Sequence, residues 1–334
     1  MTPEAARPGR ACPPAYGYAP SVFARPHEIS ADVLYVVGGL YGNIAALREV
    51  ECMAAREAAP ARLVFNGDFH WFDAEAADFL AVDQAVMRHV ALRGNVETEV
   101  ANEATGNGCG CAYPESVADD DVERSNRILA RLRAAAREAE RQSPGLTQRL
   151  ASLPMHLVAE VDGARIGIVH GDAWSLAGWR FAHDALHGEA DQERLARVFE
   201  QAAVDGFAST HTCLPALKAI ATDSGDRFVV NNGAAGMPNF RGTRCGVLTR
   251  IAARPVPAAL HDARLYGADF GGLHVDALAV RFDVSAFEAR FARLWPAASD
   301  AAVSYGRRIL HGPDFSIADA LGRTKSANCA ALAA

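Results

Sequence analysis

Five short polar motifs, each placed directly after an apolar run, carry the residues of this sequence that could do chemistry. Apolar stretches such as Leu63 to Phe65 and Phe228 to Val230 are typical of buried strands, so each motif is expected on the loop at the carboxyl end of a strand. Open α/β sheets build their sites at these ends. Because Asp, Asn and His are metal-ligand types, the pattern predicts a metal site. The motifs are Gly67-Asp68, Arg93-Gly94-Asn95, His170-Gly171, Thr210-His211-Thr212 and Asn232-Gly233.

The composition excludes several classes of protein. The chain has 334 residues, of which 50% are hydrophobic, enough for one large domain or one domain with appendages. A net charge of -7 gives no support for general binding to nucleic acid or to acidic membranes, apart from a local basic patch between Arg124 and Arg141. No stretch approaches the roughly 18 uninterrupted apolar residues of a membrane span. Seven scattered cysteines and a beginning without signal-peptide features favour a reducing cytoplasm.

Strands and helices alternate in the first part of the chain. Strands are predicted at Val33 to Val37 and Arg62 to Phe65, helices at Ile44 to Arg56 and Ala74 to Val90, and a further strand ends at Leu92. This alternation predicts parallel strands with helices on the faces of the sheet. Residues 1–30 are rich in Pro, Ala and Tyr without periodicity, and we expect them to form an irregular N-terminal arm.

An insertion and a hairpin interrupt the alternation. Residues from about 102 to 145 combine a Gly/Cys loop with a charged helix from about Asp121 to Gln142, and we interpret them as a cap. His156 to Val161 and Arg165 to Val169 flank Asp162-Gly163, the signal of a type I′ hairpin, which places His170 at a strand end. The remaining predicted elements are helices at Gln192 to Val204, Ala286 to Leu294 and Ser299 to Leu310, and strands at Gly206 to Ser209, Arg227 to Val230, Cys245 to Ile251 and Ala277 to Phe282.

The order of the motifs resembles the calcineurin-like metallophosphoesterase family from about Asp32 to Ile251. In that family an Asp-x-His-Gly-Asn turn, a Gly-Asp turn, a Gly-Asn-His or Gly-Asn-Cys turn, a lone His and a Gly-His-x-His turn surround two metal ions. The corresponding segments here are Gly39-Leu40-Tyr41-Gly42-Asn43, Gly67-Asp68, Gly94-Asn95-Val96-Glu97, His170 and Thr210-His211-Thr212-Cys213, and Asn232-Gly233-Ala234-Ala235-Gly236 resembles the family's Asn-Pro-Gly-Ser turn. The resemblance implies an α/β four-layer sandwich of two mixed β-sheets flanked by helices over residues 31–252, with residues 253–334 as a C-terminal extension that packs on it.

The resemblance also implies roles for individual residues. Asp68 would bridge the two metals, and Asn95, His170 and His211 would complete the second metal site, so that these four residues would carry the catalysis. Taken alone, Asp68 would more readily be interpreted as a helix cap, but the order of five motifs favours a ligand. The second site is therefore expected to be intact.

The first metal site of the family is degenerate in this chain. Its Asp is replaced by Gly39, which has no side-chain ligand, and its two histidines are replaced by Tyr41 and Cys213. A phenolate and a thiolate favour a softer or more oxidised metal than Mg²⁺ or Mn²⁺. The family's catalytic His or Cys after Gly-Asn is Val96, which cannot transfer a proton. We expect Tyr41 and Cys213 to face the first-metal position.

Two classes of function follow. Two-metal hydrolysis needs ions roughly 3.5 to 4 Å apart, and Gly39 leaves that pair incomplete. A single divalent transition metal (Mn, Fe or Zn) on the second site still lowers the pKa of a bound water, which favours a phosphoester hydrolase, a phosphatase or phosphodiesterase, for a small phosphorylated metabolite or nucleotide. One ion is expected rather than two. The alternative is a catalytically inactive ligand-binding or regulatory protein on the same fold.

Two candidate substrate-binding residues have structural alternatives. Arg93 is placed to bind two phosphate oxygens through its guanidinium, or it pairs with a carboxylate such as Glu97. Asn43 stands at the start of the first helix, where backbone N–H groups attract an anion, and it serves equally well as an N-cap.

Further residues lie near the motifs. His70 and Asp172, each two residues after a predicted ligand, could replace a missing first-site ligand, but solvent exposure is the preferred expectation for both. Cys109 and Cys111 follow the Asn95 loop closely enough to reach the site, with buried thiols in a small-residue turn as the preferred interpretation. Core packing or a lid is preferred over a pocket wall for three tryptophans, Trp71, Trp174 and Trp179.

Overall fold

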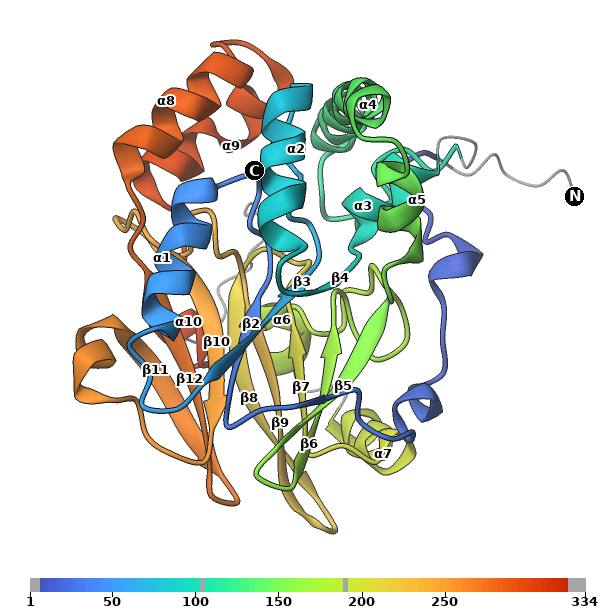
Figure 1. The fold of residues 1–334 in the computed structure, drawn as a ribbon. Helices are drawn as coiled ribbons and strands as arrows, with labels where there is room; N and C mark the ends of the chain where they lie inside the picture. Colours follow the sequence, from blue (N-terminus) through green and yellow to red (C-terminus); the bar gives the residue numbers. More distant parts are fainter. Residues whose placement is uncertain (1–6, 103–105, 189–191, 324–334) are drawn as a thin grey trace, which may run out of the picture.

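The computed structural model describes residues 7–102, 106–188 and 192–323, which form two β-sheets flanked by helices (Figure 1). Residues 1–6 of the predicted arm, 103–105 of the predicted insertion, 189–191, and 324–334 of the predicted extension lie outside the described residues. Within the described ranges no helix is both long enough and apolar enough to cross a bilayer.

Both sheets have six strands and mix parallel with antiparallel pairs. The first has the order β1-β5-β6-β7-β9-β8, with β1 Ile29–Ser30, β5 His156–Val161, β6 Ala164–Val169, β7 Gly206–Ser209, β9 Gly225–Asn232 and β8 Pro215–Thr222. The second has the order β11-β12-β10-β2-β3-β4, with β11 Arg264–Phe270, β12 Leu273–Val280, β10 Gly246–Ala252, β2 Val33–Val37, β3 Ala61–Asn66 and β4 Val90–Leu92. The predicted alternation at the start of the chain yields parallel pairs between β2, β3 and β4.

The period-two pattern of β2 shows how the layers arise. Successive side chains of a strand point to opposite faces. Val33, Tyr35 and Val37 accordingly join the core under the helices, whereas Leu34 and Val36 join the core between the two sheets. A strand buried on both faces must be apolar throughout, which is why this run was recognisable in the sequence.

Helices cover the outer face of each sheet (Figure 1). α1 Ile44–Ala54 and α2 Ala76–Val86 share a core with the outward side chains of β2 and β3, while α7 Gln192–Ala202 packs on the first sheet together with the 3-10 helix Pro20–Phe23. The four-layer α/β sandwich is therefore confirmed. The predicted helix from Ala74 to Val90 is shorter in the structure because its apolar pattern runs on into β4.

The insertion and the C-terminal extension are built into the domain. The insertion contains α4 Asp119–Gln142, as predicted, and is followed by α5 Leu146–Ser152. The extension contributes β11 and β12 directly to the second sheet, where β12 pairs with β10. The other helices are α3 Asn95–Ala101, α6 His183–His187, α8 Val284–Leu294, α9 Asp300–His311, α10 Ile317–Ala320 and the 3-10 helices Pro14–Tyr16 and Ala258–Ala263.

Turn chemistry explains the register of the hairpin that ends at His170. Asp162 and Gly163 have φ values of 51° and 82°, as a type I′ turn requires, and they join β5 to β6 in the predicted register. Strands β1, β8 and β11 and helices α3, α5, α6 and α10 were not predicted. β8 starts with Pro215 and carries small residues and Lys218, so it lacks the signal of an apolar run.

Candidate metal centre

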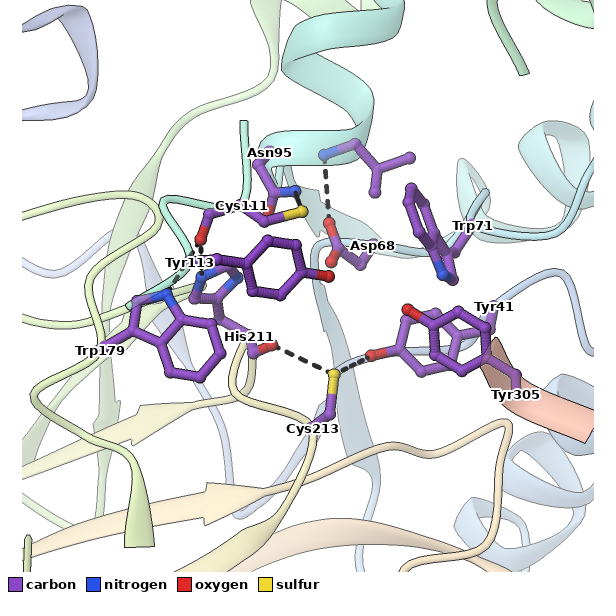
Figure 2. A pocket seen from close by; sticks show the side chains of 11 residues that line it. Tyr41, Asp68, Trp71, Asn95, Cys111, Tyr113, Trp179, His211, Cys213 and Tyr305 are labelled. Carbon is purple, nitrogen blue, oxygen red and sulfur yellow. Dashed lines mark hydrogen bonds between the residues drawn. The ribbon is translucent and has the colours of Figure 1, made fainter. Parts of the chain in front are cut away.

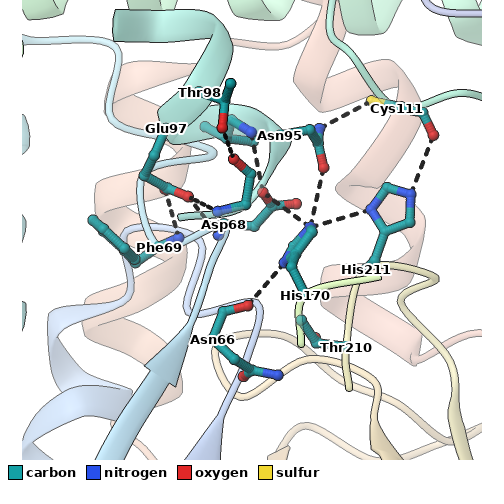
Figure 3. A network of polar contacts seen from close by, with 12 residues as sticks. Asn66, Asp68, Phe69, Asn95, Glu97, Thr98, Cys111, His170, Thr210 and His211 are labelled. Carbon is teal, nitrogen blue, oxygen red and sulfur yellow. Dashed lines mark hydrogen bonds and ion pairs between the residues drawn. The ribbon is translucent and has the colours of Figure 1, made fainter. Parts of the chain in front are cut away.

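The loops at the carboxyl ends of β3, β4, β6 and β7 meet and bring four predicted ligands together (Figure 3). Asp68 follows β3, Asn95 begins α3 just after β4, His170 follows β6 and His211 follows β7. Ligand atoms of Asp68, His170 and His211 all lie within 4.8 Å of one another. In the part of the chain that the structure describes, these three residues form the one group of three or more His, Cys, Asp or Glu side chains with such geometry.

The Nε2 atom of His170 lies at the centre of this cluster. It is 3.0 Å from Asn95 Oδ1, 3.2 Å from His211 Nδ1 and 3.4 Å from Asp68 Oδ1. Asn95 Nδ2 donates to the carbonyl of Cys109 at 3.0 Å, which turns its Oδ1 atom towards the cluster. Four potential ligand atoms therefore converge from four different loops.

In each histidine, the ring nitrogen that points away from the cluster contacts a backbone carbonyl. His170 Nδ1 contacts the carbonyl oxygen of Asn66 at 2.8 Å, and His211 Nε2 contacts that of Cys111 at 3.1 Å. Carbonyl partners of this kind fix the tautomer and orientation of metal-binding histidines. Each imidazole is thus oriented with its other nitrogen towards the shared point.

The spacing and chemistry of these atoms fit a divalent transition metal. Nitrogen and oxygen ligands lie about 2.0 to 2.2 Å from such an ion, so two ligands on one ion are separated by about 3.0 to 3.4 Å, depending on the coordination angle. The distances from His170 Nε2, 3.0 to 3.4 Å, match this separation. One carboxylate, one amide oxygen and two imidazoles suit Mn, Fe or Zn.

Protonation states in the cluster follow from burial and from Asp68. Burial alone would lower the pKa of His170, but the charge of Asp68 and hydrogen bonds to Asp68 and to the Asn66 carbonyl raise that pKa above its ordinary value. Burial, together with the charge on His170, lowers the pKa of His211 to about 3. Burial alone would raise the pKa of Asp68, but His170 lowers it. An ion bound here would replace the Nε2 proton of His170.

Four of the predicted ligand positions have left-handed backbone conformations. The φ values are 53° at Tyr41, 54° at Asp68, 46° at His211 and 62° at Cys213. Such conformations are uncommon outside Gly and Asn, and each costs about 1 to 3 kcal/mol, so they persist where the surrounding structure enforces them. Backbone strain is therefore concentrated at the candidate centre.

Glu97 connects two of the motif loops, a role that the sequence analysis missed. Its fully buried carboxylate accepts backbone N–H bonds from Gly94 and Asp68 at 2.8 Å, from Phe69 at 3.0 Å and from His70 at 3.3 Å. Burial, and then the charge of Asp68, raises the pKa of Glu97. The available signal was the glutamate three residues after Gly94, which is the spacing of a capping box.

Tyr41 and Cys213, which were expected to face a first-metal position, contact each other. Tyr41 Oη and Cys213 Sγ are 2.9 Å apart, and both residues line the same cavity as Asp68 (Figure 2). Burial raises the pKa of both groups, so the phenol and the thiol are neutral. A Cβ atom at Gly39 would lie 3.0 Å from the Tyr41 ring. The absence of a side chain at Gly39 therefore makes room for the Tyr41 ring.

The two predicted substrate-binding residues are engaged elsewhere. Arg93 donates to the carbonyl of Ala151, and its alternative partner Glu97 is taken up by backbone N–H groups. Asn43 is the N-cap of α1, where Oδ1 accepts from the N–H of Ala46 at 3.0 Å and Nδ2 donates to a carbonyl. Neither residue is among the described residues that line the cavity.

The expectation that His70 and Asp172 are solvent-exposed was wrong. Their relative exposures are 0% and 2%, because the loops that carry them fold inward. His70 Nδ1 contacts Asp73 Oδ2 at 2.8 Å, and the Asp172 carboxylate accepts the N–H groups of Trp174, Ser175 and Arg180. Neither side chain lines the cavity among the described residues, so they do not replace a first-site ligand.

The cysteines and tryptophans divide between core and cavity. Cys109 and Cys111 are buried, as preferred, and Cys111 also lines the cavity. Trp71 and Trp179 are cavity residues, whereas Trp174 packs beside the guanidinium of Arg180. The alternative of a pocket wall therefore applies to two of the three tryptophans.

Comparisons with known proteins concern the fold. No protein-family model and no curated protein matches the sequence. Hypothetical protein PH1004 from Pyrococcus horikoshii OT3 matches in structure with a TM-score of 0.53 at 14% identity, over 85% of this chain and 99% of that chain. A metallophosphoesterase from Sphaerobacter thermophilus has a TM-score of 0.44 at 14% identity, over 78% and 93%. YfcE, a phosphoesterase from E. coli, has a TM-score of 0.32 at 15% identity, over 65% and 87%.

Architecture and motif order agree with one another. The two six-stranded sheets flanked by helices have the arrangement that the resemblance implied, and the motifs quoted from the sequence meet at the carboxyl ends of their strands. The fold of this chain is therefore that of the calcineurin-like metallophosphoesterases.

Proposed function

We propose that this protein is a metal-dependent phosphoester hydrolase that uses one divalent transition metal, held by Asp68, Asn95, His170 and His211. The observation that carries the proposal is that three ligand atoms lie 3.0 to 3.4 Å from a fourth, His170 Nε2, with both histidines oriented by carbonyls. When bound, the ion would supply Lewis acidity and an activated water, as metals do in such sites. Tyr41 and Cys213 are poorer metal ligands than the four residues named above, which favours one ion over two.

The residues around the ligands indicate how the site would treat its substrate. The backbone N–H of Val96 donates to Asp68 Oδ1 at 3.2 Å and helps to position that carboxylate, but the Val96 side chain cannot protonate a leaving group. Hydrolysis should therefore depend strongly on the leaving group, with aryl esters cleaved faster than alkyl esters. The substrates we propose are small phosphorylated metabolites or nucleotides.

The rival function is ligand binding without catalysis. Two observations favour it. The Tyr41 phenol and the Cys213 thiol form a hydrogen bond with each other where the first metal was expected. Val96 has no side-chain proton donor. A protein of this kind would bind a phosphorylated ligand at the same metal without turning it over.

Turnover and metal content separate the two functions. The full chain is loaded with Mn²⁺, Zn²⁺ or Fe²⁺ and tested on phosphomonoesters and phosphodiesters with aryl and alkyl leaving groups. The test variant is Asp68→Asn, and the matched control is Asp226→Asn, which changes an exposed carboxylate on β9. Elemental analysis should find one ion per chain, lost in His170→Ala.

The outcomes are distinct. Activity that disappears in Asp68→Asn and persists in Asp226→Asn supports the hydrolase. If wild type and Asp68→Asn are equally inert with every metal, the outcome supports ligand binding without catalysis. Two tightly bound ions per chain would show that Tyr41 and Cys213 rebuild the first site. We also propose the cytoplasm as the compartment, supported by the free thiols of the six cysteines in the described part of the chain.

A further inference from the structure

Two groups of aromatic side chains form facing walls of the cavity (Figure 2). On the side of His211, Tyr113 and Trp179 have ring centroids 5.9 Å apart, and on the opposite side Trp71 and Tyr305 are 6.3 Å apart. Asp68 lies between the two walls in this view. The walls are formed by residues that do not belong to the metal-binding motifs.

Four segments of the chain supply these rings, and Trp71 belongs to the loop between β3 and α2. Tyr113 belongs to the insertion, Trp179 to the loop that follows β6, and Tyr305 to α9 in the C-terminal extension. These three side chains are partly exposed, whereas Trp71 is 4% exposed. The cavity itself has a volume of only about 40 Å³, room for a few water molecules. An organic group on a ligand must therefore lie between the exposed rings at the rim.

The charges that face the cavity limit the charge of a ligand. Among the described residues that line it, Asp68 is the one carboxylate, and no lysine or arginine is present. A divalent ion together with Asp68 would give a net charge of 2 - 1 = +1, which a monoanion balances. A dianionic phosphomonoester would leave an uncompensated negative charge in a buried site, which is unfavourable.

We propose that this site selects a phosphodiester monoanion in which one ester arm is planar and aromatic, as in a nucleotide diester. The proposal rests on the proposed function, because it assumes one ion at the four ligands. The aromatic arm stacks on the partly exposed rings of Tyr113, Trp179 and Tyr305, and the phosphate lies towards Asp68. Tyr113, Trp179 and Tyr305 are then the specificity-determining residues.

Binding can be measured without turnover by probes whose substituents are joined to phosphorus through carbon. The probes are diphenylphosphinate, an aromatic monoanion; phenylphosphonate, an aromatic dianion above its second pKa; and dimethylphosphinate, a monoanion without rings. Each is titrated calorimetrically into the Mn²⁺-loaded full chain. We expect diphenylphosphinate to bind about tenfold or more tightly than either of the others, the scale of one stacked ring.

Variants of the wall test which residues carry the selection. Tyr305→Leu should reduce the preference for diphenylphosphinate over dimethylphosphinate by about tenfold, with Mn²⁺ affinity unchanged. Trp179→Leu should do the same, although its Nε1–H also donates to the Cys111 carbonyl at 2.9 Å, so Tyr305 is the cleaner position. The matched control is Trp174→Leu, because Trp174 packs beside Arg180 and Arg194 away from the cavity.

Each outcome decides between named alternatives. Phenylphosphonate binding as tightly as diphenylphosphinate would overturn the charge argument, and dimethylphosphinate binding as tightly would overturn the aromatic one. Failure of all probes to bind a chain that does bind Mn²⁺ would overturn the whole inference. Binding in the expected order by a protein that hydrolyses no ester would uphold this inference and remove the hydrolase, so the two failures are distinguishable.

Discussion

Gly94→Ala tests whether the close approach of two motif loops sets the metal site. Gly94 has φ -93° and ψ -170°, a conformation that alanine adopts freely, so the substitution adds no backbone strain. A Cβ atom there would lie 2.3 Å from Asp68 Oδ1 and 2.8 Å from His170 Cε1, whereas ordinary contact begins at 3.4 Å. Because 3.4 - 2.3 = 1.1, the Asp68 oxygen must move by about 1 Å.

A displacement of this size is large for a metal site, where ligand distances are set to within about 0.2 Å. Perturbing the groups that position ligands costs about 10- to 100-fold in metal affinity, or about 1.4 to 2.7 kcal/mol. We expect a loss in this range for Mn²⁺ and Zn²⁺, measured by calorimetric titration of the metal-free chain. The melting temperature should rise less on metal addition than it does for wild type.

The control is Gly306→Ala in α9, where the added Cβ meets nothing within 4 Å. Alanine inside a helix stabilises by roughly 0.5 to 1 kcal/mol relative to glycine, so this variant should melt slightly higher and bind metal as wild type does. If Gly94→Ala keeps wild-type metal affinity, Asp68 and His170 are not the ligands, and the assignment of the centre fails.

Three further predictions concern the surroundings of the centre. Glu97→Gln should lower the free energy of unfolding by about 3 kcal/mol, because one amide oxygen cannot replace a carboxylate that accepts four N–H groups; a loss below about 1 kcal/mol in denaturant titrations contradicts the connecting role. Alkylation of Cys213 can be measured in a chain whose other cysteines are changed to Ser. If Tyr41 and Cys213 bind no ion, alkylation should be slow and unchanged by Zn²⁺. Protection of Cys213 by the metal would instead show a rebuilt first site. Burial, and then the charge of Arg25, lowers the pKa of His156 in the folded chain to about 4. As the pH falls, the imidazole is therefore protonated in the unfolded chain before it is protonated in the folded chain. The stability of the fold should decrease as the pH falls from about 6.5 towards 4. His156→Phe should lose less stability over that window, and parallel pH profiles for the two proteins would refute this.

Local patterns were enough to predict most strands and helices of this fold, and the family resemblance added their arrangement in four layers. A strand such as Val33–Val37, apolar at every position, is buried on both faces wherever it folds, and a period-two or period-3.6 pattern is a property of neighbouring residues. The ligands were also accessible from the sequence, because a strand end followed by Asp, Asn or His places that residue at the sheet edge in any α/β arrangement. Asp68, Asn95, His170 and His211 were predicted as ligands because the order of these motifs also resembles the calcineurin-like metallophosphoesterases.

Other features of the site depend on contacts between residues far apart in the chain. The left-handed backbone at Tyr41 and Cys213 goes against the preference of these residue types, and it is enforced by loops that meet only in the folded state. Arg93 looked like a phosphate contact, but a carbonyl at Ala151, 58 residues away in sequence, binds its guanidinium. Local pattern cannot reveal such partners.

The aromatic walls show the same limit most clearly. Tyr113 and Tyr305 carry no motif, and 305 - 113 = 192 positions separate them, yet the loop before α4 and helix α9 bring both to the same cavity. Strand ends and motif order were therefore enough to predict which residues lie together at Asp68, His170 and His211. The aromatic residues around the cavity could not be predicted in this way, because their positions depend on how an insertion and a C-terminal extension fold back over the sheets.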